Sequence, residues 1–185
     1  MEYKQALEKA WSEISALTDK SNFSVVFLAD EYDIDLEKRN VFSVSCNVPA
    51  KEYISILVLH YLIKRFTLKI LPKPTGNWID FKQLDGGVAY YPAFKKRTID
   101  VILRKFGKNP EALLAAAGRF GAKVLNIGDV AVVVEAFEKM PFLITMWKQD
   151  QEFAAEANIV FDETIPRVFC TEDIVVLTEY IAHSL

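Results

Sequence analysis

The carboxylates that follow Trp147 are the first residues of this chain whose types and spacing could support chemistry. Asp150 and Glu152 stand two positions apart, and Phe153 follows directly. In an extended chain alternate side chains point the same way, so the two carboxylates could bind Mg²⁺ or Ca²⁺ or share a proton. The competing interpretation is that Asp150 accepts hydrogen bonds within a turn and Glu152 is solvated. Trp147 and Phe153 would then be core residues.

A glycine turn ahead of a basic helix is the second candidate. Gly86 and Gly87 precede Tyr90 and Tyr91, and three cations follow at residues 95–97. Backbone N–H groups at a helix start can hold an anion, and tyrosine rings can stack on a flat ligand. The spacing is neither a Walker loop nor a dinucleotide-binding fingerprint. A chain reversal beside a solvated basic face is the alternative.

Histidine and cysteine give no metal signature. His60 is inside a predicted helix, without a second His or Cys three or four residues away. It could be a ligand or a general base, but a hydrogen-bonded core histidine is the more common case. Cys46 and Cys170 lie far apart, and we expect both to be reduced core thiols. Histidine and cysteine therefore predict no metal site, and no metal ligand is assigned.

Length and composition limit the class of protein. The chain has 185 residues, of which 51% are hydrophobic, so one domain over residues 1–185 can bury a sizeable core. The net charge of -3 argues against a nucleic-acid-binding face. The first 17 residues form an amphipathic pattern rather than a signal peptide, and no apolar run could span a bilayer. We expect a soluble, cytoplasmic protein that does not bind membranes.

Apolar periodicity and turn residues predict the elements that must position these residues. Pro92 is expected to open one of the helices, and Thr171 to cap the last one. The predicted helices span residues 1–17, 49–66, 80–83, 92–106, 111–120 and 171–185. The predicted strands lie within residues 22–29, 31–46 as a hairpin, 122–137 as a second hairpin, 141–147 and 154–162.

The order of these elements predicts the fold class. Strands and helices come in blocks rather than in strict alternation, which favours an α+β fold with one antiparallel or mixed sheet packed with helices. The turn-rich residues 71–78 are the best candidate for an internal boundary. Because each half would be small, we expect a single domain.

Several segments together resemble a known family. They read "NWIDF", "GGVAYYPAF", "IGDVAVVVEAF", "MPFLITMWKQDQEFAAEANIVFD" and "TEDIVVL". In this combination the chain resembles the DUF3786 family, a domain of unknown function found in bacteria and archaea, many of them anaerobes. The resemblance covers essentially the whole chain and is most specific over residues 147–162. It implies a family and a fold but not an activity.

The same resemblance bears on the acidic segment and on partners. Family members tend toward Asp-Glu-Glu-Phe-Pro after the tryptophan, whereas this chain has Gln151 and Ala154 in place of the second acid and the proline. These departures argue against a strict metal-binding motif in this segment. Some relatives carry iron–sulfur segments like those of corrinoid proteins, which implies a redox or corrinoid partner. This chain lacks the cysteines for such a cluster.

Three hypotheses for function remain. The first is a non-catalytic module that binds a small ligand. The second is an interaction protein that serves a redox or corrinoid system, and the third is a metal-assisted or acid–base enzyme using Asp150 and Glu152. The lack of a local catalytic signature favours binding, so no catalytic residue or cofactor is assigned, and homo-oligomerisation stays open. The ligand-binding residues that we predict are Gly86, Gly87, Tyr90, Tyr91, Trp147, Asp150, Glu152 and Phe153.

Overall fold

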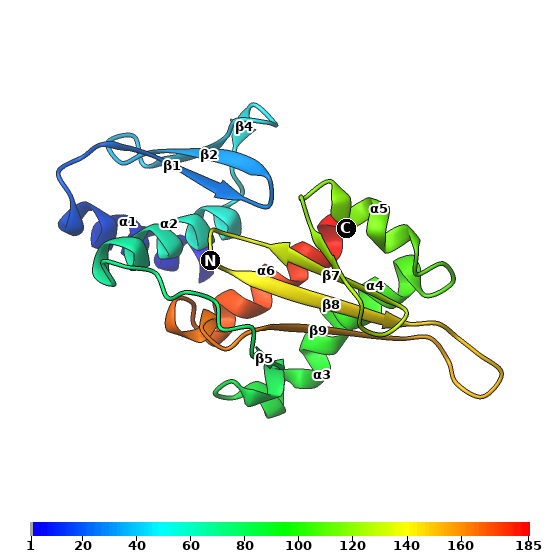
Figure 1. The fold of residues 1–185 in the computed structure, drawn as a ribbon. Coiled ribbons are helices and arrows are strands. Elements are labelled where there is room, and N and C mark those ends of the chain that lie inside the picture. Colours follow the sequence, from blue (N-terminus) through cyan, green and yellow to red (C-terminus); the bar gives the residue numbers. More distant parts are fainter. Residues whose placement is uncertain (1) are drawn as a thin grey trace. The chain divides into compact units, whose positions relative to one another are not determined.

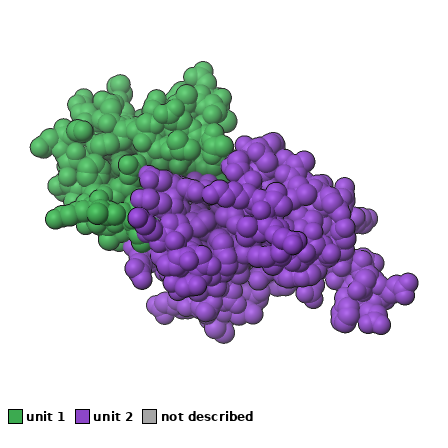
Figure 2. All heavy atoms as spheres, in the orientation of Figure 1, with its two compact units in different colours: residues 1–72 green, residues 73–185 purple. Residues whose placement is uncertain are grey.

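The computed structural model describes residues 2–185, which divide into two compact units. One unit ends at Pro72 and the other begins at Lys73 (Figure 2). The division falls inside the turn-rich segment 71–78 that the sequence marked as the best internal boundary. Each unit has its own sheet and its own helices, so each is described by itself.

The N-terminal unit packs two helices on a four-stranded antiparallel sheet of order β1-β2-β3-β4 (Figure 1). Alternate strand residues, such as Val25, Tyr32 and Ile34, are buried on the face toward the helices, as period-two burial requires. Trp11, on the amphipathic first helix, is buried. The elements are α1 (Glu2–Leu17), β1 (Asn22–Phe27), β2 (Asp30–Asp35), β3 (Asn40–Ser43), β4 (Val48–Pro49) and α2 (Glu52–Thr67).

The C-terminal unit is built on a five-stranded antiparallel sheet of order β5-β9-β8-β7-β6. Helix α4 packs on β9 and α5 packs on β7, while α6 packs on α3 and α4 (Figure 1). Its strands are β5 (Trp78–Ile79), β6 (Lys123–Leu125), β7 (Val130–Glu135), β8 (Pro141–Trp147) and β9 (Glu156–Asp162). Its helices are the 3-10 helix η1 (Phe81–Gln83), α3 (Gly87–Arg97), α4 (Ile99–Phe106), α5 (Ala112–Gly118), the 3-10 helix η2 (Ile165–Arg167) and α6 (Thr171–Ser184).

The predicted α+β class is confirmed, with the strands divided between two antiparallel sheets. Within residues 2–185, no helix is long and apolar enough to cross a bilayer. The helix predicted for residues 80–83 is present as η1, and Asp80 and Gln83 form a reciprocal capping box at its start. The two short strands β4 and β5 were not predicted: Pro49 of β4 was assigned to the start of the helix predicted for residues 49–66, and β5 lies at the end of the turn-rich segment 71–78.

The helix predicted for residues 92–106 is wrong in its boundaries. Helix α3 begins at Gly87, directly after Gly86 with a φ of 69°, so Pro92 lies inside the helix. The chain then breaks at Thr98 and continues as α4. The glycine pair was interpreted as a turn ahead of a helix that starts at Pro92, whereas the left-handed Gly86 leads directly into the helix at Gly87.

Two further predictions are corrected. Cys46 and Cys170 are exposed and free rather than buried. Thr171 is the first residue of α6 rather than its cap, because Cys170 holds the cap position and the Thr171 hydroxyl donates to the carbonyl of Asp85 at 3.1 Å. His60 lies in α2 and is half-buried.

Candidate functional site

A pocket of about 240 Å³ lies at one end of the C-terminal sheet. Its walls come from all five strands or the residues beside them, and from the segment that follows the unit boundary. Every lining residue belongs to the C-terminal unit. The lining residues are Pro74, Gly76, Trp78, Gly121, Lys123, Val133, Glu135, Pro141 and Asp162. This cavity is called the sheet-end pocket below.

The strand register explains why these residues meet. Trp78 on β5 pairs with Asp162 on β9, and Pro141 on β8 pairs with Glu135 on β7. The β8–β9 register, continued by one residue, sets Asp162 beside Pro141. Side chains directly across neighbouring strands point to the same face of a sheet. Residues 78, 162, 141 and 135 therefore form one row across four strands.

A second cross-strand pair completes the pocket wall on the far edge. Val133 on β7 pairs with Lys123 on the edge strand β6. Val133 is two residues from Glu135, so its side chain lies on the same face as the row. Lys123 is the one cationic residue in the pocket lining, and its side chain is exposed.

Asp162 is a fully buried carboxylate at the centre of this row, with 0% of its surface exposed. One oxygen accepts from the backbone N–H and the hydroxyl of Thr164, at 3.0 and 2.7 Å. The other accepts from the backbone N–H of Gly76 at 2.7 Å and the hydroxyl of Thr75 at 3.5 Å. Burial raises the pKa of Asp162, but these hydrogen bonds outweigh burial and hold it below the usual value of 3.8.

Hydrogen bonds to Glu163 hold the remaining wall of the pocket in place. The Thr75 hydroxyl and the Asn77 side-chain amide each donate to the Glu163 carboxylate at 2.9 Å. The backbone N–H of Glu163 donates to the carbonyl of Asn77 at 2.9 Å. Gly76 between them has a φ of 82°, a conformation that glycine adopts without strain. The turn over residues 75–77 is thus bound to the end of β9.

The acidic segment after β8 is a closed turn rather than an extended chain. One oxygen of Asp150 accepts the backbone N–H groups of Glu152 and Phe153, at 2.8 and 2.7 Å. The N–H of Asp150 donates to the carbonyl of Phe153 at 3.0 Å. The bonds from Phe153 and Glu152 lower the pKa of Asp150. The turn interpretation of Asp150 is confirmed, and the alternation of an extended strand does not apply here.

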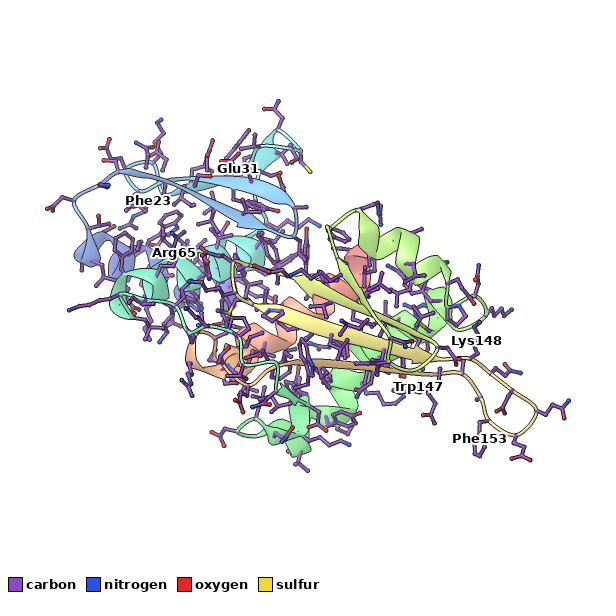
Figure 3. All side chains as sticks on the ribbon, viewed as in Figure 1. Phe23, Glu31, Arg65, Trp147, Lys148 and Phe153 are labelled. Carbon is purple, nitrogen blue, oxygen red and sulfur yellow. The ribbon has the colours of Figure 1, made fainter. Side chains whose placement is uncertain are left out.

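The two aromatic residues of this segment are exposed, so their assignment to the core in the turn interpretation is wrong. Phe153 is 65% exposed and Trp147 is 40% exposed. Figure 3 shows Phe153 on the loop that extends beyond the end of the strands. Within residues 2–185, no group of three or more His, Cys, Asp or Glu side chains is arranged to hold a metal ion.

Trp147 rests on the turn between β6 and β7. A Cβ atom added to Gly128 would lie 3.2 Å from Nε1 and Cε2 of the indole, and Gly128 has a φ of 61°. The backbone N–H of Lys148 donates to the Asp129 carboxylate at 2.7 Å, and the Lys148 ammonium pairs with Glu111 (Figure 3). These contacts fasten the end of β8 to the neighbouring turn.

The glycine turn and the tyrosines form a separate group at the start of α3. A Cβ atom on Gly87 would lie 2.0 Å from the carbonyl oxygen of Phe81, so only glycine fits there. The Lys82 ammonium lies 4.2 Å from the ring centre of Tyr91 and occupies one of its faces. Tyr90 is 41% exposed. The backbone of this turn is therefore shaped by packing against η1.

The structure does not bring the eight predicted site residues together. Trp147 pairs with Glu156 at the first residue of β9, whereas β5, which leads into η1 and the glycine turn, pairs with the last two residues of that strand. Seven strand residues extend about 20 Å, so the two groups lie at opposite ends of β9. Neither group lines the sheet-end pocket.

Sequence reasoning missed the pocket residues because they come from four separate segments. Asp162 is the last residue of the strand predicted within residues 154–162, and it falls in the alternation with the polar residues Glu156 and Asn158, where a carboxylate is expected to meet water. The buried environment comes from Thr75 and Gly76, which lie 87 and 86 residues earlier in the chain. A polar pair at the end of an apolar strand, Asp162 and Glu163, was the one local signal.

No curated protein and no solved structure matches the chain. One family model does match, and it covers residues 6–184 of the 185. Its description is "Domain of unknown function (DUF3786)", and the sequence segments that predicted this resemblance lie within the matched range. The chain therefore belongs to the DUF3786 family.

Proposed function

We propose that the protein is a non-catalytic module that binds a small ligand in the sheet-end pocket. The observation that carries this proposal is the row of Trp78, Asp162, Pro141 and Glu135 along one concave site. Ligand sites are mostly apolar hollows with a few placed polar groups, and drug-sized ligands need about 300–1,000 Å³. A pocket of about 240 Å³ suits a smaller molecule.

The chemistry of Asp162 supports binding over catalysis. A general acid or base works best with a pKa near the working pH. The pKa of Asp162 lies below 3.8, and both of its oxygens already accept hydrogen bonds from the protein. Asp162 therefore stays ionised at neutral pH and contributes a fixed charge rather than a proton. We also place the protein in the cytoplasm, where free exposed thiols such as Cys46 and Cys170 stay reduced.

The test is a thermal-shift screen of the full chain against amines, amino acids, nucleotides, flavins, corrinoids and divalent metals. A ligand at a hundred times its Kd stabilises the fold by ~2.7 kcal/mol, a rise of several degrees in Tm. We expect Trp78→Leu to abolish the shift and Trp147→Leu, the matched change at the other end of β9, to preserve it. A shift that depends on Trp147 instead, or no shift with any class, would contradict the proposal.

The second candidate function is an interaction protein that serves a redox or corrinoid system. Its support is the exposed apolar group at the Trp147 end of the sheet, where Phe153 is 65% and Ile127 is 43% exposed. Exposed apolar patches often mark protein–protein contacts. The class of partner rests on the family resemblance alone, which is an analogy.

Co-purification from a native cell extract tests this candidate. We expect the double variant Trp147→Ser and Phe153→Ser to lose a partner that the unchanged chain and Trp78→Leu both retain. Sedimentation of the pure protein tests whether the same surface joins two copies of the chain. Self-association that the double variant loses would identify it as a homodimer contact.

A further inference from the structure

We propose that the sheet-end pocket selects a small organic cation, an ammonium group carrying methyl or short alkyl substituents. This inference deepens the proposed function and rests on it. It begins with the charges of the lining, where two carboxylates, Asp162 and Glu135, face one ammonium, Lys123. The pocket therefore carries a net negative charge at neutral pH.

The buried carboxylate makes this charge effective. All four donors that Asp162 contacts are neutral, being two backbone N–H groups and two hydroxyls. Hydrogen bonds from neutral groups stabilise an anion without cancelling its charge, and low surrounding polarity strengthens its field. Among residues 2–185, the described ion pairs include none that joins Lys123 to Asp162 or Glu135. The field at the pocket therefore favours a cation.

The apolar walls define what kind of cation fits. Trp78 is half-buried beside Asp162 in the row, and indole is the best aromatic partner for a cation. Pro74, Pro141 and Val133 add apolar surface. Such walls suit methyl or methylene groups on the nitrogen better than a bare ammonium, which needs hydrogen-bond acceptors.

Three of the four carboxylate oxygens in the lining already accept hydrogen bonds from the protein. Both oxygens of Asp162 are occupied, and Oε1 of Glu135 accepts the backbone N–H of Lys139 at 2.9 Å. A primary ammonium would carry three donors into this site and leave some unsatisfied, which costs free energy. A quaternary or highly substituted ammonium carries none or one. The pocket thus favours alkylated nitrogen over free ammonium.

The test compares choline with its uncharged isostere 3,3-dimethylbutan-1-ol by calorimetry on the full chain. The two probes share shape, so only the charge differs. We expect choline to bind at least roughly tenfold more tightly, the effect of a desolvated cation–π contact together with the carboxylate field. Ammonium chloride at the same concentration should bind more weakly than choline.

Two variants give the sign of the charge preference, and a third tests the aromatic wall. Glu135→Gln should weaken choline binding several-fold, Lys123→Met should strengthen it, and Trp78→Leu should abolish it. Glu135 and Lys123 are exposed, so neither change should lower Tm by more than about 2 °C. Equal binding of the two probes, or stronger binding of an anion that Lys123→Met weakens, would overturn the inference.

The outcomes separate this inference from the proposed function. If choline and related ammonium probes do not bind but another ligand class binds in a Trp78-dependent way, the inferred cation preference is wrong and the proposed binding function is supported. If no ligand of any class binds, both fall together.

Discussion

At the scale of single residues, Asp162 shows how one carboxylate can be both structural and functional. Its two oxygens bind the strand end to Thr164 and to the turn at Gly76. The same contacts place its charge on the pocket wall. Asp150, which the sequence made more conspicuous, instead closes an exposed local turn. The surroundings of each carboxylate, rather than its local sequence, decide its role.

Replacement of Asp162 by Asn should destabilise the fold by about 1–3 kcal/mol. One carboxylate oxygen becomes an NH₂ group, which cannot accept the hydrogen bonds that this oxygen accepts in the unchanged chain. The measurement is urea unfolding at pH 7. Asp150→Asn is the matched control, because Asn keeps the oxygen that accepts both turn bonds, and we expect a loss below about 0.5 kcal/mol. Equal losses for the two variants would contradict this assignment.

The pH dependence of the same variant has a definite sign. The folded-state pKa of Asp162 lies below the unfolded value near 3.8, so its contribution is fully present above that pH. It is lost as the pH falls through the folded pKa. The difference in unfolding free energy between the unchanged chain and Asp162→Asn should therefore shrink below pH 3.8. A difference that stays constant down to pH 2 would show that the charge has no role.

At the scale of elements, most helices and strands follow from local patterns. The apolar periodicity of α1, α2, β8 and α6 predicted each within a few residues. The misplaced helix start at Pro92 shows the limit of this reasoning, because residues 86–91 were interpreted as a turn, whereas they begin α3 or cap it. Gly86 has a left-handed φ of 69°, and the next residue, Gly87, packs so closely on the carbonyl of Phe81 that no Cβ atom fits.

The β6–β7 turn should be sensitive to a single methyl group. Gly128→Ala should cost about 1–2 kcal/mol, because Gly128 has a positive φ and the new Cβ atom would press on the Trp147 indole. Tm and tryptophan fluorescence measure the effect. Gly118→Ala in α5 is the control, since nothing lies within 4 Å of the added atom, and it should be neutral or stabilising by up to ~1 kcal/mol.

At the scale of the whole molecule, the chain forms two compact units, each with its own antiparallel sheet. The sheet-end pocket draws all of its lining from the unit that begins at Lys73. The turn over residues 75–77 comes directly after the unit boundary and is part of that pocket wall. The proposed binding function therefore resides in the C-terminal unit.

A fragment of residues 73–185 should fold by itself and unfold in one sharp thermal transition, since a unit with its own sheet and core commonly does so. Circular dichroism during heating measures this. A shorter fragment, residues 80–185, lacks β5 and the Gly76 N–H donor to Asp162, so we expect a clearly lower Tm. A broad transition for the longer fragment would contradict its independence.

Local pattern was enough to predict the α+β class and most element types, because apolar spacing and turn residues act within about ten residues of one another. The family came from the resemblance of whole segments, which the family model confirms. The turn at Asp150 was one of two interpretations that the sequence left open, and its partners are only two and three residues away. The division into two sheets and the sheet-end pocket were decided by the tertiary structure. Trp78, Lys123, Glu135 and Asp162 meet only through strand register, and burial of Asp162 depends on Thr75, 87 residues earlier. Long-range pairing is set by the packing of the whole unit, which no short stretch of residues encodes.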